Sequence, residues 1–308
     1  MRECTNNELN LKEDPRDLLK TNPNNFVGLY NLGATCYLNS ILQTLFMDMT
    51  FRKGIYDCQS SNGKEKTKCE QVLNELQLLF ASLQLSNKRY YVPRSFTKML
   101  NIKNGIQQDA QEFSRLFLGF LEEKFSENND LRLLIKRFEG ETSFLTKCSG
   151  CSSISCFDSK FKDIFLPIEN VSSIFDSLKQ QFLSYEKLEK DNQSFCENCK
   201  SKNDSIRYQV IKKLPPVLNI QISRFNFDPK SLTKKKSKKE IEFSFFMNMS
   251  AFVSEFDLEN LPQPPQQNQK NFSDVTNEDY LYLLTAILIH KGDDPYSGHY
   301  VAHVRDQM

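Results

Sequence analysis

The spacing of apolar residues predicts a helical first half of the chain. Between Cys36 and about Met49, apolar residues recur three and four positions apart, which places them on one face of a helix. The same spacing predicts helices over Val72 to Leu83 and Ala110 to Leu121, and Pro93 is suited to open a short helix between them. The polar stretch from Cys58 to Lys68 predicts a loop.

The second half has a different pattern. After about Phe138, short apolar runs bounded by turn residues predict strands, and only Val171 to Leu183 keeps helical spacing. A helical half followed by a strand-rich half predicts an α+β fold. The predicted strands are Phe144–Thr146, Phe157–Ile168, Ile206–Ile211, Val217–Phe227, Leu283–His290 and His299–Val304.

Two segments have the composition of chain outside a packed core. Residues 1–25 are polar and charged, which predicts a loose N-terminal lead-in. The low-complexity run PQPPQQNQKN predicts a flexible insertion at about residues 262–272.

Composition excludes several classes of function. The 308 residues are 39% hydrophobic and carry a net charge of +1, so no global field points to nucleic acid or to an anionic membrane. The longest apolar stretch, Leu281 to Ile289, is too short to span a bilayer. Nine cysteines without a secretory signal indicate a reducing compartment, cytoplasmic or nuclear, with thiols as ligands, nucleophiles or core residues. We expect a monomer that binds neither nucleic acid nor membrane.

Cys36 is the strongest candidate for chemistry. A polar, glycine-containing loop delivers it to the start of a predicted helix, where the positive end of the helix dipole favours the nucleophilic thiolate. Asn31, five residues upstream, could donate its amide to a developing oxyanion. The alternative is an ordinary buried cysteine, which is the commoner role of a free thiol.

A cysteine nucleophile needs a base within hydrogen-bond reach. The chain has only three histidines, and His299 is the best placed, at the start of a strand after the polar turn Lys291 to Gly298. We expect His290 and His303 to support that strand or to face solvent. The sequence therefore predicts a cysteine hydrolase.

Four further cysteines have the spacing of a metal site. Cys148 with Cys151, and Cys196 with Cys199, form two Cys-x-x-Cys turns, and four thiolates suit tetrahedral zinc. The alternative is a coincidence of core or redox cysteines. The remaining cysteines, Cys4, Cys58, Cys69 and Cys156, have no such partners. The lysine run 234–239 predicts a solvated turn, with nuclear import or a charged contact as alternatives.

Four segments carry a resemblance to a known family. They are Gly28–Gln43 around the cysteine, Gln107–Phe113 (QQDAQEF), Leu218–Phe225 (LNIQISRF) and Tyr280–Val304, which ends in the histidine box. In residues and in order they resemble the ubiquitin-specific proteases, papain-like cysteine deubiquitinases. The resemblance implies a catalytic domain over residues 26–308, with a helical thumb, a strand-rich palm and zinc-bearing fingers at about 139–213.

The resemblance also implies roles for single residues. It makes Cys36 the nucleophile, His299 the general base and Asn31 the oxyanion donor, and it places one structural zinc on the four paired cysteines at the tip of the fingers. The box around residue 109 would contact the basic C-terminal tail of ubiquitin, since carboxylates hold arginines through charge-assisted bonds. The ubiquitin-contacting residues implied in this way are Gln108, Asp109 and Glu112.

One part of the family pattern is missing. An Asn or Asp normally follows the histidine box on the next strand, and Asp306 is the only carboxylate beyond His299 here. Asp293 and Asp294 in the preceding turn are weak substitutes. We expect a C-terminally incomplete catalytic domain, an exposed edge on its last strand and lowered activity.

The function that follows is hydrolysis of the isopeptide or peptide bond after the C-terminal glycine of ubiquitin, with ubiquitin and ubiquitinated proteins as partners. The alternatives are a ubiquitin-binding module with weak or no turnover, and a zinc protein with only a scaffold role.

Overall fold

The computed structural model describes residues 19–22, 26–59, 67–103, 105–228, 232–253, 280–295 and 297–305, in two compact units. The first comprises residues 1–134, 286–292 and 296–308, and the second residues 135–285 and 293–295. The predicted insertion at 262–272 and most of the predicted lead-in lie outside the described residues.

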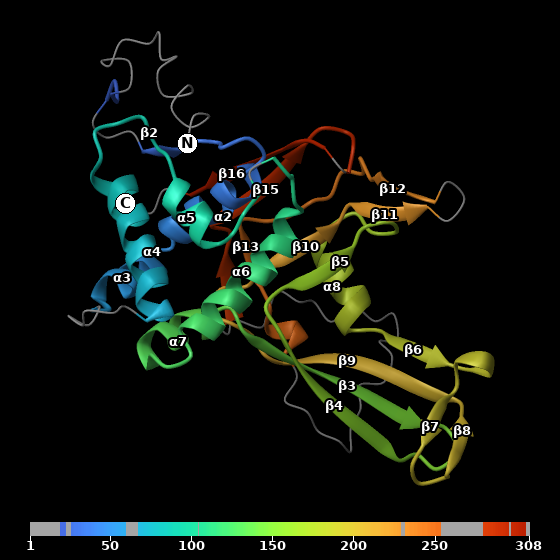
Figure 1. The fold of residues 1–308 in the computed structure, drawn as a ribbon. Coiled ribbons are helices and arrows are strands. Elements are labelled where there is room, and N and C mark those ends of the chain that lie inside the picture. The colour runs from blue at the N-terminus through green and yellow to red at the C-terminus, as the bar shows by residue number, and fades with distance from the viewer. Residues whose placement is uncertain are drawn as a thin grey trace. The chain divides into compact units, whose positions relative to one another are not determined.

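Helices dominate the first unit (Figure 1), and all four that the sequence predicted are present. Two more, α3 and α7, were not predicted. The described part of the chain contains no helix that is long and apolar enough to cross a bilayer. The helices are α2 (Cys36–Met47), α3 (Met49–Asp57), α4 (Lys68–Leu85), α5 (Arg94–Met99), α6 (Ala110–Lys124) and α7 (Asn129–Lys136), of which the last two residues belong to the second unit.

The expected helix from Cys36 to Met49 is interrupted at Asp48, so its predicted end was wrong. The backbone of Asp48 is extended, and its Oδ1 accepts the N–H groups of Thr50 and Phe51 at 3.0 Å each. This side chain therefore caps a separate helix, α3, because it satisfies two donors that have no partner within that helix. α4 begins with a capping box, in which Thr67 and Glu70 bond each other's backbone N–H groups.

The core of the first unit lies between α2, α3, α4 and α6. Phe80 of α4 contacts Phe46 and Phe51 edge-on, with ring centroids 5.6 and 6.3 Å apart. Tyr37 of α2 contacts Phe113 of α6 in the same way, at 5.0 Å. The apolar faces read from the sequence are thus the faces that pack, and they hold the start of α2 in one position.

The last two strands of the chain belong to this helical unit. β15 (Ala286–Lys291) and β16 (His299–Val304) form an antiparallel hairpin in which Lys291 pairs with His299 and His290 with Tyr300. β16 packs against α2, and among the described residues it pairs with no strand other than β15. A short parallel pair, β1 (Gly28–Leu29) with β2 (Tyr90–Tyr91), joins the loop before α2 to the segment before α5.

The described part of the second unit is mostly strands, with one α-helix, α8 (Ile174–Phe182), and short 3₁₀ helices η2 (Lys190–Asn192) and η3 (Ser250–Phe252). α8 packs on a core that includes Ile164, Leu166 and Ile211. A four-stranded sheet has the order β4-β3-β9-β6, from β4 (Ile154–Phe161), β3 (Gly140–Cys148), β9 (Ser205–Lys213) and β6 (Tyr185–Leu188). The paired short strands are β7 (Ser194–Cys196) with β8 (Ser201–Asn203), β5 (Ile164–Pro167) with β10 (Ile220–Ser223), β11 (Phe225–Asp228) with β12 (Thr233–Lys236), and β13 (Phe246–Asn248) with β14 (Leu281–Leu283).

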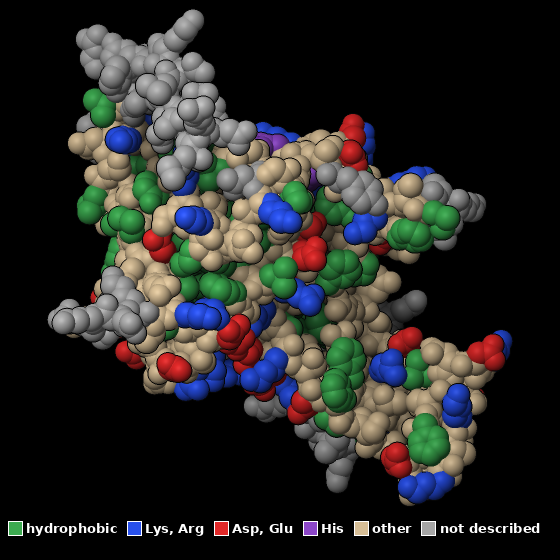
Figure 2. Space-filling model, in the orientation of Figure 1, with side chains coloured by type: hydrophobic (Ala, Val, Ile, Leu, Met, Phe, Trp, Pro, Cys, Tyr) green, Lys and Arg blue, Asp and Glu red, His purple; other side chains and the backbone are tan. Residues whose placement is uncertain are grey.

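Three sequence predictions for this unit were wrong in detail. The run Val217–Phe227 is not one strand, because β10 ends at Ser223 and β11 starts at Phe225. The run Phe157–Ile168 is not one strand, because β4 ends at Phe161 and β5 starts at Ile164. The lysine run is not only a turn, because Lys234 to Lys236 form part of β12. The visible face in Figure 2 carries side chains of both charges interspersed, in keeping with the net charge of +1.

Candidate active site and metal centre

Cys36 is the first residue of α2, and its side chain is only 5% exposed. The loop before it turns at Gly33, whose φ of +129° lies in a region that residues with a Cβ rarely adopt. Thr35, the residue at the helix boundary, is fully buried. A glycine at position 33 is therefore required by the backbone conformation of the loop. The thiol lies at the start of the helix, as predicted.

The side chain of Asn31 has a defined orientation. Its Oδ1 accepts the backbone N–H of Thr35 at 3.0 Å and the hydroxyl of the same residue at 3.1 Å, while that hydroxyl accepts the N–H of Leu32 at 3.0 Å. Because a backbone N–H can only donate, the oxygen of the carboxamide must face Thr35. The amide nitrogen of Asn31 therefore points away from Thr35, and its role as an oxyanion donor stays a prediction.

Two residues that the sequence reasoning did not single out hold this loop on α2. Asn39 Nδ2 donates to the carbonyl oxygens of Leu29 at 3.3 Å and Tyr30 at 3.2 Å. Gln43 Nε2 donates to the carbonyl oxygen of Val27 at 3.1 Å. The sequence signal for this contact is a pair of polar residues one turn apart on a helix face that is otherwise apolar.

The strand that carries His299 reaches the thiol. The backbone N–H of Tyr300, the next residue, donates to Cys36 Sγ at 3.4 Å across 264 positions of sequence. Consecutive Cα atoms are about 3.8 Å apart, so the backbone of His299 lies beside the sulfur. The His299 side chain is exposed. The structure thus brings together the start of α2 and the start of β16, which the sequence could pair only because a cysteine nucleophile needs a base.

The other two histidines have different surroundings. His290 on β15 is half-buried and packs on the ring of Tyr300, with centroids 4.8 Å apart. His303 is exposed. These positions agree with the supporting and solvent-facing roles expected for them.

The QQDAQEF segment contacts the same strand. Asp109 is the N-cap of α6, where its Oδ1 accepts the N–H groups of Gln111 at 2.8 Å and Glu112 at 3.1 Å. Its Oδ2 accepts the hydroxyl of Tyr300 at 3.4 Å. The carboxylate of Asp109 is therefore engaged inside the unit, whereas Gln108 and Glu112 are exposed at its surface. Contact of these residues with ubiquitin stays a prediction.

Burial raises the pKa of the Tyr300 hydroxyl from 10.0 to about 12, with the negative charge of Asp109 as the next cause. The unfolded chain ionises this tyrosine from pH 10 upward and the folded chain does not, so its contribution to stability is complete below pH 10 and is lost as the pH rises toward 12. We predict that wild type loses about 1.4 kcal/mol more stability between pH 9 and 11 than Tyr300→Phe does. Urea unfolding at both pH values measures the difference, and equal losses would contradict the prediction.

The structure gives no contact between the weak substitutes for a third catalytic residue and His299 among the described residues. Asp293 belongs to the second unit and forms an exposed ion pair with Lys238 at 2.9 Å, which lowers the pKa of the carboxyl. Asp294 lies beside it in the same unit. Asp306 lies outside the described residues.

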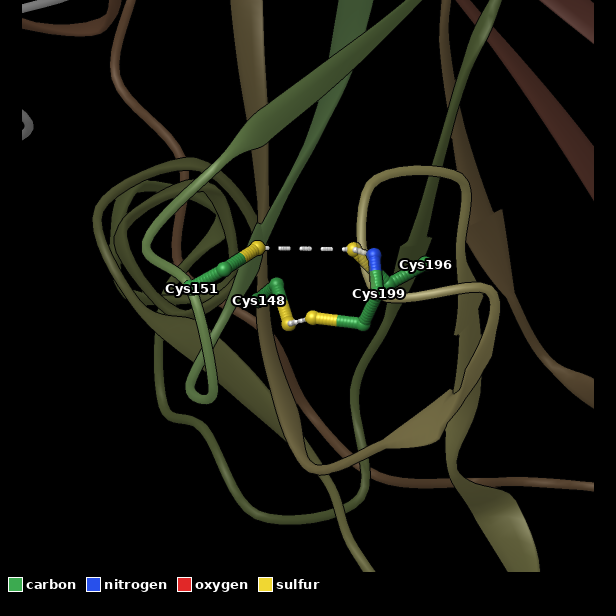
Figure 3. A group of neighbouring side chains, drawn as sticks. All are labelled: Cys148, Cys151, Cys196 and Cys199. Carbon is green, nitrogen blue, oxygen red and sulfur yellow. Dashed lines mark hydrogen bonds between the residues drawn. The ribbon is translucent and has the colours of Figure 1, made fainter.

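The four paired cysteines meet in the second unit. Cys148 ends β3 and Cys151 follows in the turn, while Cys196 ends β7 and Cys199 lies in the turn before β8. Their sulfur atoms all lie within 4.8 Å of one another, with Cys148 Sγ 4.0 Å from Cys199 Sγ and Cys151 Sγ 3.6 Å from Cys196 Sγ (Figure 3). Zinc–sulfur bonds of about 2.3 Å in a tetrahedron separate the sulfurs by roughly 3.8 Å. The cluster therefore fits a four-coordinate metal.

The pKa values of two of these thiols are shifted in opposite directions. Hydrogen bonds from Ser153 and Asn198 lower the pKa of Cys151 to about 5, and the Cys199 thiol, which bonds the neighbouring sulfur of Cys151, has a pKa raised to about 12. The backbone N–H of Cys199 donates to Cys196 Sγ at 3.4 Å. Four thiolate ligands would fill a tetrahedral site and leave no coordination position for substrate.

A thiol at the start of a helix, with a histidine-bearing strand against its sulfur, is the arrangement expected of a cysteine hydrolase. Residues 27–308 match the family described as ubiquitin carboxyl-terminal hydrolase, and the chain belongs to this family.

Named relatives agree with this assignment. The chain is 41% identical over 294 residues to ubiquitin carboxyl-terminal hydrolase 48 of Gallus gallus, and 37% identical over 303 residues to ubiquitin carboxyl-terminal hydrolase 26 of Oryza sativa subsp. japonica. These matches cover 92% and 96% of this chain and 26% of each relative, so the chain spans about a quarter of their length.

Among solved structures, the chain resembles one of the SAGA Ubp8/Sgf11/Sus1/Sgf73 DUB module bound to ubiquitin aldehyde. The TM-score is 0.70 at 25% identity, and the match covers 91% of this chain and 62% of that one.

Proposed function

We propose that this chain is a thiol-dependent deubiquitinase that hydrolyses the isopeptide or peptide bond after the C-terminal glycine of ubiquitin. The observation that carries the proposal is the hydrogen bond from the Tyr300 N–H to Cys36 Sγ, because it sets the histidine strand against a cysteine at a helix start. Membership of the ubiquitin carboxyl-terminal hydrolase family supplies the substrate class.

In the proposed reaction, the Cys36 thiolate attacks the carbonyl carbon of the last glycine of ubiquitin. The carbonyl oxygen becomes an oxyanion that accepts hydrogen bonds from Asn31 Nδ2 and from backbone N–H groups near Cys36. His299 protonates the leaving amine as the carbon–nitrogen bond breaks, which leaves a thioester. His299 then takes a proton from water, whose oxygen displaces the thiol and releases the free carboxylate of ubiquitin.

Two features support ubiquitin as the bound partner. Gln108 and Glu112 present polar groups at the start of α6, where a carboxylate can hold a basic peptide tail. The SAGA DUB module, whose fold this chain shares, was solved with ubiquitin aldehyde bound.

The metal in the proposal is zinc, held by Cys148, Cys151, Cys196 and Cys199. Its role is structural, because it would tie two short turns together where little apolar core is available. We further propose a reducing compartment, cytoplasm or nucleus, because four cysteines serve as metal-binding thiolates in this proposal.

Hydrolysis of a fluorogenic ubiquitin amide, combined with capture by ubiquitin that carries a C-terminal electrophile, tests the proposal. We expect both cleavage and a covalent adduct on the peptide that contains Cys36. An adduct without cleavage would instead support a ubiquitin-binding module with no useful turnover. If neither an adduct nor cleavage is observed, the deubiquitinase and the ubiquitin-binding module are both refuted, and a zinc protein with a scaffold role remains.

A further inference from the structure

We propose that Gln107 is a positioning residue for the catalytic histidine, an inference that rests on the proposed function. Gln107 Oε1 accepts the backbone N–H of Gly298 at 3.1 Å, across 191 positions of sequence. Gly298 directly precedes His299. The glutamine therefore contacts the backbone next to the proposed base.

The histidine lies between two fixed neighbours. On one side the N–H of Gly298 is bound by Gln107, and on the other the N–H of Tyr300 is bound by Cys36 Sγ at 3.4 Å. The hydroxyl of Tyr300 is also bound, by Asp109. The same short segment, residues 107–109, thus contacts Gly298 just before β16 and Tyr300 within it, and Cys36 makes a third contact. With the backbone of His299 fixed on both sides, its imidazole starts from a defined position relative to the sulfur.

The backbone at Gly298 lies very close to the neighbouring strand. A Cβ on Gly298 would lie 2.3 Å from His290 Nε2 and 2.4 Å from the carbonyl oxygen of Lys291, so the strands approach each other too closely here for any side chain. Gly292, at the other end of the turn, has a φ of +110°. Gln107 Oε1 supplies the acceptor for the Gly298 N–H at this close approach.

The hydrogen bond between Gln107 and Gly298 is exposed to solvent, so its loss should affect catalysis more than stability. Water can replace a lost hydrogen bond at the surface, so the bond adds little to the stability of the fold. Alignment of a general base is far more sensitive, because a misplacement of about 1 Å can lower turnover about 100-fold. We therefore expect a large effect on kcat and a small effect on thermal unfolding.

Three variants test the role. Gln107→Leu removes the acceptor, Gln107→Glu keeps an acceptor oxygen at the same place, and Gln84→Leu makes the same change at an exposed position of α4. Hydrolysis of a fluorogenic ubiquitin amide gives kcat and KM separately. We expect Gln107→Leu to lower kcat about 10- to 100-fold with KM within about twofold of wild type. Gln107→Glu should recover most of kcat, and Gln84→Leu should behave as wild type.

The split between kcat and KM distinguishes this role from its rival. If Gln107 holds ubiquitin, its loss raises KM and leaves kcat unchanged, which would overturn the inference. Equal losses in Gln107→Leu and Gln107→Glu would also overturn it, because the acceptor would then be irrelevant. Thermal unfolding of each variant separates a loss of kcat from a loss of folded protein.

A second readout does not depend on ubiquitin. Alkylation of Cys36 by iodoacetamide, followed on its peptide by mass spectrometry, reports how well the imidazole assists the thiolate. We expect slower alkylation in Gln107→Leu than in Gln84→Leu. If wild type cleaves no ubiquitin amide, the proposed function fails, and this rate still supports or overturns the positioning role.

Discussion

Replacement of Cys36 by alanine is expected to lower hydrolysis of a fluorogenic ubiquitin amide by about 10⁴-fold or more, because no other group can form the thioester. The side chain is 5% exposed and small, so alanine fits the site. Binding of ubiquitin should be unchanged, since the substitution removes a reacting atom and no surface. Steady-state rates and calorimetric titration with ubiquitin measure the two properties.

Cys36→Ser refines this prediction. Its hydroxyl can still accept the N–H of Tyr300, which donates to the sulfur at 3.4 Å in the native protein. The loop and strand should therefore stay in place while the nucleophile becomes much weaker. We expect thermal unfolding as in wild type and turnover close to that of Cys36→Ala.

The matched control is Cys69→Ala on α4, a cysteine outside the proposed machinery. It should keep the activity of wild type. Retention of a tenth or more of the activity in Cys36→Ala, or an equal loss in Cys69→Ala, would show that the nucleophile has been assigned to the wrong residue.

The second large effect is expected at the cysteine cluster. The purified protein should contain close to one zinc per chain, and Cys196→Ser should lose most of it, because three thiolates cannot close a tetrahedral structural site. β7 and β8 have three residues each, and a hairpin of that length is not stable without further contacts. Loss of the metal should therefore unfold the tip of the second unit.

The cost should be large but smaller than that of a whole zinc finger. Zinc binding is worth roughly 10–16 kcal/mol in zinc-finger peptides, which have no fold without it. The sheet here has its own apolar cluster of Leu145, Tyr208 and Val210. We expect a loss of about 3–5 kcal/mol. Metal analysis and urea unfolding of Cys196→Ser check both parts.

Cys156→Ser is the control, because Cys156 lies on β4 of the same sheet and outside the cluster. It should keep full metal content and stability. Full zinc content in Cys196→Ser would refute the ligand assignment, and a different metal in the wild-type protein would refute zinc.

The sequence predicted the helices well where one face packs and the ends carry clear signals. α4 and α6 follow from their apolar spacing, and Pro93 correctly marked the start of α5. The break at Asp48 was missed because apolar spacing continues through it, although an aspartate is a common helix cap. β12 was missed because a lysine run does not resemble a strand, and its pairing with β11 overrides that composition.

The candidate site followed from the sequence in part. Cys36 and the four paired cysteines could be found because their spacing and local context carry chemical meaning. Asn39, Gln43, Gln107 and Tyr300 were not singled out, because they act through contacts with groups to which local spacing does not relate them. When a side chain bonds a main-chain atom, the residue that supplies that atom can be of any type. The sequence therefore does not show which two residues are bonded.

The sequence by itself determined which elements form and which chemistry they carry: an amphipathic helix that begins with a cysteine, a histidine at the head of a strand, and two cysteine turns. Only the tertiary structure decided that the last hairpin joins the helical unit rather than the strand-rich half that precedes it. The reason is physical. Local spacing fixes which side of an element is apolar, whereas the surface that covers that side is selected by packing between segments hundreds of residues apart. The meeting of Tyr300 with Cys36 is an outcome of that packing.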